Sequence, residues 1–487
     1  MLRFSLIIAV VGLIVQSFSL VMIIPLLVSL MVGQYDSTLL FLLCTLSGLA
    51  FGRLTMRLNP KRDFNDLTRL EGMGAVAFGW LAVAIFGSIP YLGNGFGFID
   101  SLFEAMSGFT TTGATILSDF NVFNSSMFFY RGFTQWLGGM GILVLFIAIL
   151  PHLAISGRQL FFAETSSAST EKLTPRIVHT ARSLWGYYFF LTLVQAFTLI
   201  WLGMPAIDAF ANTFTTMAAG GFSPHPQSIM GYQSAAVEWV IILFMFLAGA
   251  NFTLQVKAVK GDLKAFFANS ELRIYLLIIA ASSVVLTVLL TSTYQSNDLI
   301  DNFRIAIFQN LSILTTTGFA SVDFELWSES AKTVLLLLMF IGGCSGSAGG
   351  GIKVIRMLLL IKYLRRVLLR TIYPEVVLRI KLQNRTFKET DVQPAISFVM
   401  LYFFFFAVGG FAASLLESNM VVGFSGAIAT LGNIGPGFGA IGPMGSFAGL
   451  SSLTKLIYTF LMWIGRLEIM ALAVFLRRET WSDARWS

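Results

Sequence analysis

The sequence Thr110-Thr111-Thr112-Gly113 interrupts a hydrophobic, helix-rich region with small polar residues that end in glycine. Threonine is β-branched and favours an extended backbone over a helix, and glycine reaches conformations that other residues avoid. At membrane depth such a backbone is tolerated only where it is buried in protein or lines a water-filled cavity. The stretch therefore predicts an irregular segment within a membrane, with its carbonyl groups turned to one side.

Related segments recur along the chain at Thr315-Thr316-Thr317-Gly318, Met217-Ala218-Ala219-Gly220 and Gly432-Asn433-Ile434-Gly435. A single one would fit a kink where small residues let helices pack closely. Four of them predict a four-sided pore, because rings of carbonyl oxygens can replace the hydration shell of a monovalent cation. The expected backbone ligands are Thr111, Thr112, Gly113, Ala218, Ala219, Gly220, Thr316, Thr317, Gly318, Asn433, Ile434 and Gly435.

The composition is that of an integral membrane protein. Of the 487 residues, 56% are hydrophobic and 12% are charged, whereas soluble domains carry about 25% charged residues. The net charge of +7 comes from basic residues between hydrophobic spans, which indicates membrane topology and not binding to nucleic acid. Cys44 and Cys344 lie far apart in apolar or glycine-rich surroundings, so we expect buried free thiols.

The chain is predicted to be an all-α polytopic membrane protein with four pseudo-repeats around a central pore. The apolar run Phe4–Met31 is too long for a signal peptide and predicts an uncleaved span, followed by a second near Leu39–Leu54. Each repeat has a span, a short pore helix, a filter segment and a second span. We expect two peripheral helices and a loop in residues 1–69, and pore repeats in 70–157, 158–264, 265–388 and 389–487, the last with a short cytoplasmic tail.

Three of the pore helices are expected to begin with an Ile-Asp pair, at Asp100, Asp208 and Asp301. Aspartate is a good N-cap and favours the positive end of the helix dipole. The partly negative end then faces the pore, where it stabilises a cation. With the last residue of each filter segment as reference, a phenylalanine stands at one offset, at Phe103, Phe210 and Phe308. Long second spans are expected at Phe133–Leu153, Ala235–Leu254 and Leu453–Leu476.

The distribution of lysine and arginine predicts the orientation. Basic residues occupy the connections between repeats, with a dense set from Lys353 to Lys388. The filter-side segments Leu92–Asp100, Gly203–Val237 and Ser418–Ser452 carry no lysine or arginine. We therefore expect filters that open outward and cytoplasmic termini.

A glycine- and serine-rich stretch, Gly342–Gly351, interrupts the second span of the third repeat and is expected to break the helix. Gly346 and Gly351 have the spacing of a phosphate-binding loop. However, Ile352 stands where the lysine is needed, and no strand precedes the stretch. The chain itself is therefore expected to bind no nucleotide.

Arg466 lies in the last apolar span. An arginine at the bilayer centre costs about 2.5–3.5 kcal/mol or more, so it should face the pore or a partner. A structural ion pair or snorkelling to the inner surface is the alternative. Arg466 and Glu468 point to different faces of a helix and are not expected to pair with each other.

These motifs resemble the TrkH/KtrB/HKT superfamily of potassium-translocating membrane proteins, and look most like its TrkH branch. The resemblance covers the whole chain and is carried by Thr110–Gly113, Thr315–Gly318, Gly432–Gly439 and Gly342–Ser347. It implies that potassium is the bound ion and that the glycine-rich stretch and Arg466 form a gate below the filter. The implied gate residues are Gly342, Gly343, Cys344, Ser345, Gly346, Ser347, Gly349, Gly350, Gly351 and Arg466.

The resemblance also implies potassium uptake across the bacterial inner membrane by a homodimer that is controlled by a cytoplasmic TrkA-type nucleotide-binding ring. A potassium–proton or potassium–sodium symporter is the alternative, and Glu104 and Glu468 are its only candidates for a coupling site. No enzyme is expected, since His152, His179 and His225 show no metal-ligand spacing and the sequence shows no recognisable nucleophile–base arrangement. We expect Glu104 to orient the first pore helix.

Overall fold

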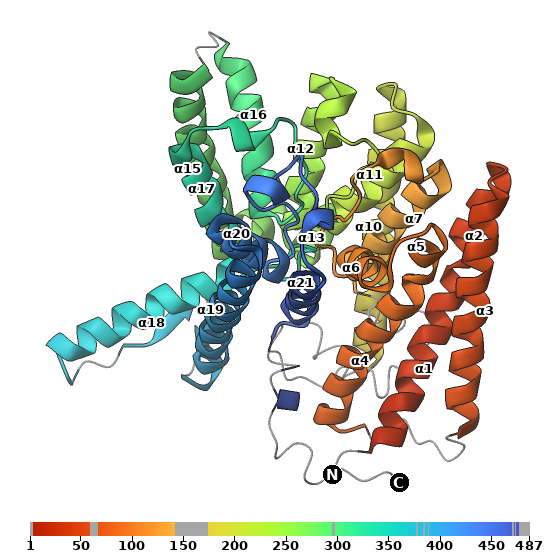
Figure 1. Cartoon of the computed structure of the whole chain (residues 1–487). Helices are drawn as coiled ribbons and strands as arrows, with labels where there is room; N and C mark the ends of the chain where they lie inside the picture. Colours follow the sequence, from red (N-terminus) through yellow and green to blue (C-terminus); the bar gives the residue numbers. More distant parts are fainter. Residues whose placement is uncertain are drawn as a thin grey trace.

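The computed structural model describes residues 3–58, 67–141, 174–294, 298–375, 378–382, 385–387, 389–469, 472 and 474–476. In these ranges the chain is mostly helical (Figure 1). Six helices are long and apolar enough to cross a membrane, or seven if the bent pair α12–α13 is one span. The fold is therefore the expected all-α polytopic membrane protein.

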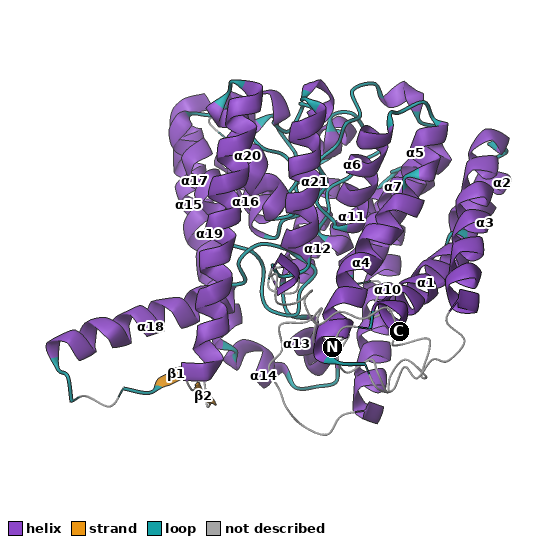
Figure 2. Ribbon diagram, turned by 60° about the horizontal axis from the view of Figure 1, so that its bottom comes forward, coloured by secondary structure: helices purple, strands orange, loops and turns teal. Residues whose placement is uncertain are grey.

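Three N-terminal helices lie together at one edge of the molecule (Figures 1 and 2). The first predicted span is α1 (Phe4–Val21) and α2 (Ile23–Met31), and the second is α3 (Tyr35–Leu58). Glycines allow α1 and α3 to approach closely, because a Cβ on Gly52 would lie 2.8 Å from the carbonyl oxygen of Gly12. Such small-residue contacts are typical of helix packing in membranes.

Four units follow, each with a span, a pore helix, an extended segment and an inner helix. Their bounds are α4 (Arg69–Gly87) with α5 (Ile89–Gly93), α6 (Phe98–Phe109) and α7 (Ser125–Gly139); α10 (Thr174–Trp201), α11 (Ala206–Ala218), α12 (Ala235–Gly249) and α13 (Phe252–Val259); α14 (Leu263–Ala268), α15 (Ser270–Tyr294), α16 (Leu299–Leu314) and α17 (Glu329–Met339); and α19 (Glu389–Glu417), α20 (Met420–Leu431) and α21 (Ser452–Arg466).

The three aspartates lie within the first turn of their pore helices, and the prediction that they are N-caps is wrong. Each is the third helical residue, and the caps are Gly97, Pro205 and Asp298. The carboxylates have side-chain partners instead: Lys455 for Asp100, Tyr232 for Asp208 and Arg304 for Asp301. The first turn still places their negative charge at the positive end of the helix dipole.

The inner helices end earlier than their hydropathy predicts. α7 ends at Gly139 and α21 at Arg466, and the chain bends by 105° between α12 and α13. The residues after Gly141 in the expected span Phe133–Leu153 lie outside the described ranges. In the second unit the carbonyl oxygens of Ala248 and Gly249 accept hydrogen bonds from Ala348 and Cys344. These carbonyls thus have tertiary partners in place of a further helical turn.

The helix α18 (Val354–Ile372) projects from the body at the edge opposite the N-terminal helices (Figures 1 and 2). It carries basic residues and exposed apolar residues such as Ile361 and Leu368. A short antiparallel hairpin, β1 (Ile380–Leu382) and β2 (Arg385–Phe387), connects it to α19 and pairs Ile380 with Phe387.

Candidate functional site

Each pore helix is followed by the same backbone turn. The first turn residue has a left-handed φ of +53° to +61°, at Thr111, Ala219, Thr316 and Asn433. Two positions later a glycine has a φ of +77° to +111°, at Gly113, Gly221, Gly318 and Gly435. Glycine adopts positive φ without steric cost. The four segments therefore share one register.

This register differs from the predicted one in the second segment. The counterpart of Gly113 is Gly221, and Gly220 takes the position of Thr112. Ala218 then lies before the turn, and Gly221, which the sequence analysis missed, has the backbone conformation of the other predicted filter glycines. Asp208 precedes Gly221 by as many residues as Asp100 precedes Gly113, but Asp301 lies farther from Gly318, so the aspartates alone do not fix the register.

The new register also removes Phe210 from the offset shared by Phe103 and Phe308. Phe103 and Phe308 are fully buried in their pore helices, whereas Phe210 is only partly buried. Phenylalanine is abundant in this chain, with 47 residues, so the offset of Phe210 from Gly220 is explained by chance. The glycines with positive φ, not the phenylalanines, define the repeat.

Each filter glycine packs against a backbone carbonyl of the next segment. A Cβ atom on the glycine would collide with that oxygen, so only glycine fits. The glycines and the residues that carry these carbonyls are Gly113 with Gly220, Gly221 with Thr317, Gly318 with Ile434, and Gly435 with Thr112. An added Cβ would lie 2.0, 2.0, 2.0 and 2.9 Å, respectively, from the carbonyl oxygen. The fourth segment thus returns to the first and closes a ring. Carbonyl oxygens arranged in this way are the ligands that a dehydrated monovalent cation requires.

The four glycines also line one cavity of about 250 Å³. Its walls include Thr115 and Arg131 from the first unit and Phe222 from the second. Thr115 and Phe222 follow the glycines along the chain, and Arg131 faces them from α7. The cavity therefore lies at the end of the glycine ring that is farther from the C-termini of the pore helices, and we call it the mouth of the ring.

Side-chain hydrogen bonds also stabilise the filter segments. The hydroxyls of Thr110 and Thr112 lie 2.8 Å apart, and those of Thr315 and Thr317 repeat this distance. Asn433 donates from Nδ2 to the Thr112 hydroxyl over 2.9 Å. The first and fourth segments are therefore joined by side chains as well as by the ring.

Pore-helix side chains also fix the backbone after the filter. Ile116, three residues past Gly113, donates its N–H to Glu104 over 2.9 Å, and Ser321 donates to Gln309 over 3.1 Å in the third unit. In the fourth unit Phe438 donates to the Ser425 hydroxyl over 2.9 Å. Sequence analysis singled out Glu104 alone, because an isolated glutamine or serine in an apolar helix attracts no attention.

The glycine-rich stretch Gly342–Gly351 forms a loop between α17 and α18. Its ends meet, since Gly342 donates its N–H to the carbonyl of Ile352 over 2.8 Å. The loop packs on the end of α12 through Cys344 and Ala348. Glu271, on α15, accepts from the backbone N–H of Ser345 over 2.7 Å.

The loop lies directly against the third and fourth filter segments. Gly350 donates its N–H to the Thr316 hydroxyl over 2.7 Å. A Cβ on Gly349 would lie 2.6 Å from the carbonyl oxygen of Thr315, and a Cβ on Gly350 would lie 2.4 Å from that of Gly432. Side chains at these two positions would therefore push the loop away from the filter.

Arg466, the last residue of α21, contacts the loop from the other side. Its Nη1 donates to the carbonyl of Ala348 over 3.0 Å, and its Nη2 donates to the carbonyl of Gly138 over 2.5 Å. The guanidinium thus joins the loop to the end of α7. Glu468 pairs with Arg356 at 2.5 Å.

Lys353 is a second cation at the loop, and sequence analysis did not assign it to the site. Its Nζ donates to the carbonyl of Gly349 and lies 3.4 Å from the Ser347 hydroxyl. The carbonyls of Ala348 and Gly349 therefore each accept from a basic side chain. A lysine two residues after the glycine-rich stretch was the available signal.

The comparisons with known proteins agree with this architecture. The family model described as "TrkH: Cation transport protein" matches residues 50–487. The "Trk system potassium uptake protein TrkH" of Salmonella typhimurium is 35% identical over 491 residues, covering 99% of this chain and 100% of the relative. The "Trk system potassium uptake protein TrkI" of Halomonas elongata is 32% identical and covers 94% of this chain and 93% of the relative.

A solved structure shows the same fold over the full length. The crystal structure of the potassium transporter TrkH from Vibrio parahaemolyticus superimposes with a TM-score of 0.88 at 33% identity, covering 99% of this chain and 100% of the other. Family model, relatives and solved structure each match this chain over most or all of its length. The chain therefore belongs to the TrkH family of cation transport proteins.

Proposed function

We propose that this chain is the pore subunit of a potassium uptake system. The closed ring of filter glycines and carbonyls carries this proposal, because four backbone segments converge where a cation must lose its water. The relatives named as Trk potassium uptake proteins support potassium as the ion. Potassium enters through the mouth lined by Gly113 and its counterparts and is bound by their neighbouring carbonyls.

The glycine-rich loop and Arg466 are proposed to form a gate below the filter. The loop blocks the path sterically, since Gly349 and Gly350 lie against carbonyl groups of the third and fourth segments. Arg466 adds a positive charge that opposes a cation at the same place. Opening requires the loop to leave Thr316 and Arg466.

We propose that the chain lies in the bacterial inner membrane with both termini in the cytoplasm, works as a homodimer and is controlled by a TrkA-type nucleotide-binding ring. The words "Trk system" in the relatives' names support a system of several components. The basic residues of the connections between units are the proposed docking surface of that ring. Its binding would displace the loop from the filter.

Cation flux into liposomes that contain the purified protein tests this function. We expect uptake of potassium and rubidium to exceed that of sodium, and the reversal potential to follow the potassium gradient. A reversal potential that follows an imposed proton or sodium gradient would favour the symporter instead. Absence of potassium flux both with and without the regulatory partner would contradict the proposal.

A further inference from the structure

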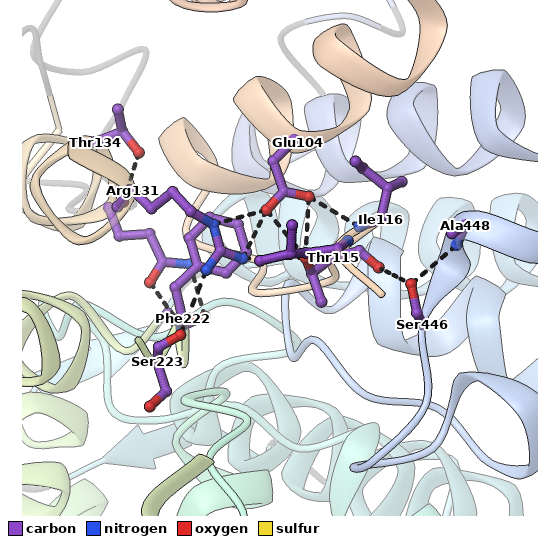
Figure 3. A network of polar contacts seen from close by, with 12 residues as sticks. Glu104, Thr115, Ile116, Arg131, Thr134, Phe222, Ser223, Ser446 and Ala448 are labelled. Carbon is purple, nitrogen blue, oxygen red and sulfur yellow. Dashed lines mark hydrogen bonds and ion pairs between the residues drawn. The ribbon is translucent and has the colours of Figure 1, made fainter. Parts of the chain in front are cut away.

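A buried ion pair stands at the outer mouth of the filter. Glu104 lies in the pore helix α6 and Arg131 in the inner helix α7, with 2.6 Å between Oε1 and Nη2. The two side chains are 0% and 2% exposed. Arg131 Nε also donates to Oε1 over 2.9 Å, so the pair is bidentate on the arginine side (Figure 3). Such geometry fixes orientation as well as distance.

The pair holds the first segment where it leaves the filter. Glu104 Oε2 accepts the N–H of Ile116 over 2.9 Å, and the Thr115 hydroxyl lies 3.0 and 3.1 Å from the two carboxylate oxygens. Arg131 Nη2 in turn donates to that hydroxyl over 3.0 Å. Thr115 is therefore held by both members of the pair, and Ile116 is held by Glu104.

The same arginine reaches the second segment. Its guanidinium carbon lies 4.0 Å from the ring centroid of Phe222, and Nη1 donates to the carbonyl of Ser223 over 3.4 Å. Both residues directly follow Gly221. Thr115 extends the network to the fourth unit, because its carbonyl accepts the N–H of Phe447 over 2.8 Å.

The third unit has a neutral side chain, Gln309, at the position of Glu104. There Gln309 accepts the N–H of Ser321, as Glu104 does for Ile116. A neutral amide is therefore enough to bind this backbone N–H. Holding one backbone N–H therefore does not explain a carboxylate at Glu104. What the carboxylate adds is a partner for Arg131, whose positive charge lines the mouth of a cation path.

We propose that Glu104 and Arg131 are a positioning pair that sets the spacing between the first and second filter segments, and with it the discrimination between potassium and sodium. Glu104 also cancels the charge of Arg131 at the mouth. This inference rests on the proposed potassium flux through the ring. A change of a few tenths of an ångström in ring spacing alters how well the carbonyls replace the hydration shell of each ion.

Arg131→Lys tests the positioning role, because lysine keeps the charge but not the planar fork. We expect the potassium-to-sodium flux ratio in liposomes to fall several-fold while potassium flux persists. Glu104→Gln leaves the arginine charge uncancelled, and we expect potassium flux to fall by about tenfold or more. The double variant Glu104→Gln/Arg131→Met removes both charges, so flux should recover relative to Glu104→Gln while the ratio stays low.

The matched control is Arg304→Lys. Arg304 lies in the pore helix α16 and pairs with Glu238 and Asp301, and neither of these partners belongs to a segment that follows the filter. It should leave the flux ratio unchanged. If Arg131→Lys does not yield folded protein, the flux ratio of the double variant Glu104→Gln/Arg131→Met tests the positioning role instead.

A wild-type flux ratio in Arg131→Lys, or in the double variant when it decides, would overturn the positioning role. Gly318→Ala, measured in parallel, separates this failure from failure of the proposed function. If Gly318→Ala lowers the ratio and the Arg131 variants do not, the pore stands and the pair is structural only. If wild-type protein shows no selective potassium flux, the proposed function itself fails, and this inference fails with it.

Discussion

The backbone N–H of Gly350 donates a hydrogen bond to the side-chain hydroxyl of Thr316 over 2.7 Å. This bond ties the glycine-rich loop to a filter residue with a left-handed backbone, at a φ of +61°. The loop and the third filter segment are therefore one packed unit in this conformation. A movement of the loop must break this bond and release the Thr316 hydroxyl to water or to an ion.

Gly350→Ala should raise basal cation flux. The added methyl group would lie 2.4 Å from the Gly432 carbonyl oxygen and 3.1 Å from the Asn433 Cβ, so the loop must shift away from the filter. Flux into liposomes without the regulatory partner measures the effect. Gly186→Ala is the control, because a Cβ on this α10 glycine meets nothing within 4 Å. Unchanged flux in folded Gly350→Ala would show that the loop does not obstruct the path.

Most elements of the fold were predictable because hydropathy and glycine placement are local signals. The first span, the pore helices and the glycine-rich break lie close to their predicted positions. The early ends of α7, α12 and α21 were not predictable, since the apolar sequence continues beyond Gly139 and Gly249. The carbonyls of Gly138 and Gly249 accept hydrogen bonds from residues of other units. The hydropathy of the sequence carries no information about such contacts.

The candidate site was also predictable only in part. The first and third segments could be read from their threonines, but the adjacent glycines Gly220 and Gly221 left the second register open by one residue. Arg131 escaped attention because it lies among aromatic residues of an apolar helix. Only the structure brings it to Glu104, 27 positions earlier in the chain.

Gly221→Ala should impair selectivity more than Gly220→Ala. Gly221 has a φ of +77°, and its added Cβ would lie 2.0 Å from the Thr317 carbonyl oxygen. A Cβ on Gly220 would instead meet the side chain of Gln135 at 2.5 Å, and Gly220, unlike Gly221, has no positive φ. The potassium-to-sodium flux ratio of the two variants provides the measurement.

Gly95→Ala controls for backbone strain in this comparison, since Gly95 has a φ of +90° and open space around its Cβ position. It should keep the wild-type ratio. A ratio more impaired in Gly220→Ala than in Gly221→Ala would return the filter to the register predicted from sequence.

Reporter fusions should show the orientation. A reporter that is active only in the cytoplasm should work when inserted within Lys362–Lys388 and fail within Ser418–Gly423, because the basic connections stay inside. The two insertions flank α19, so they lie on opposite sides of one span. The reverse pattern would put the proposed filter mouth on the cytoplasmic side.

Arg466→Ala should raise basal cation flux for an electrostatic reason. A unit charge about 4 Å from a cation opposes it by roughly 1 kcal/mol in water and about 4 kcal/mol at an effective dielectric constant of 20. Since each 1.4 kcal/mol is about a factor of ten, the flux should rise between several-fold and several-hundred-fold. Flux into liposomes is the readout, and Arg53→Ala, at an exposed position of α3, is the control.

The effect of Arg466→Ala should not add to that of deleting part of Gly342–Gly350. Arg466 donates to the carbonyl of Ala348 over 3.0 Å, so the two features act on one obstruction, and residues that share a contact are coupled. With the loop removed, water fills the space and screens the arginine, which leaves its charge less effective. We therefore expect the double variant to conduct little more than the loop deletion alone. Fully multiplicative increases would mean that loop and arginine act at separate points of the path, and flux at or below wild type in a folded deletion variant would make the loop a structural break.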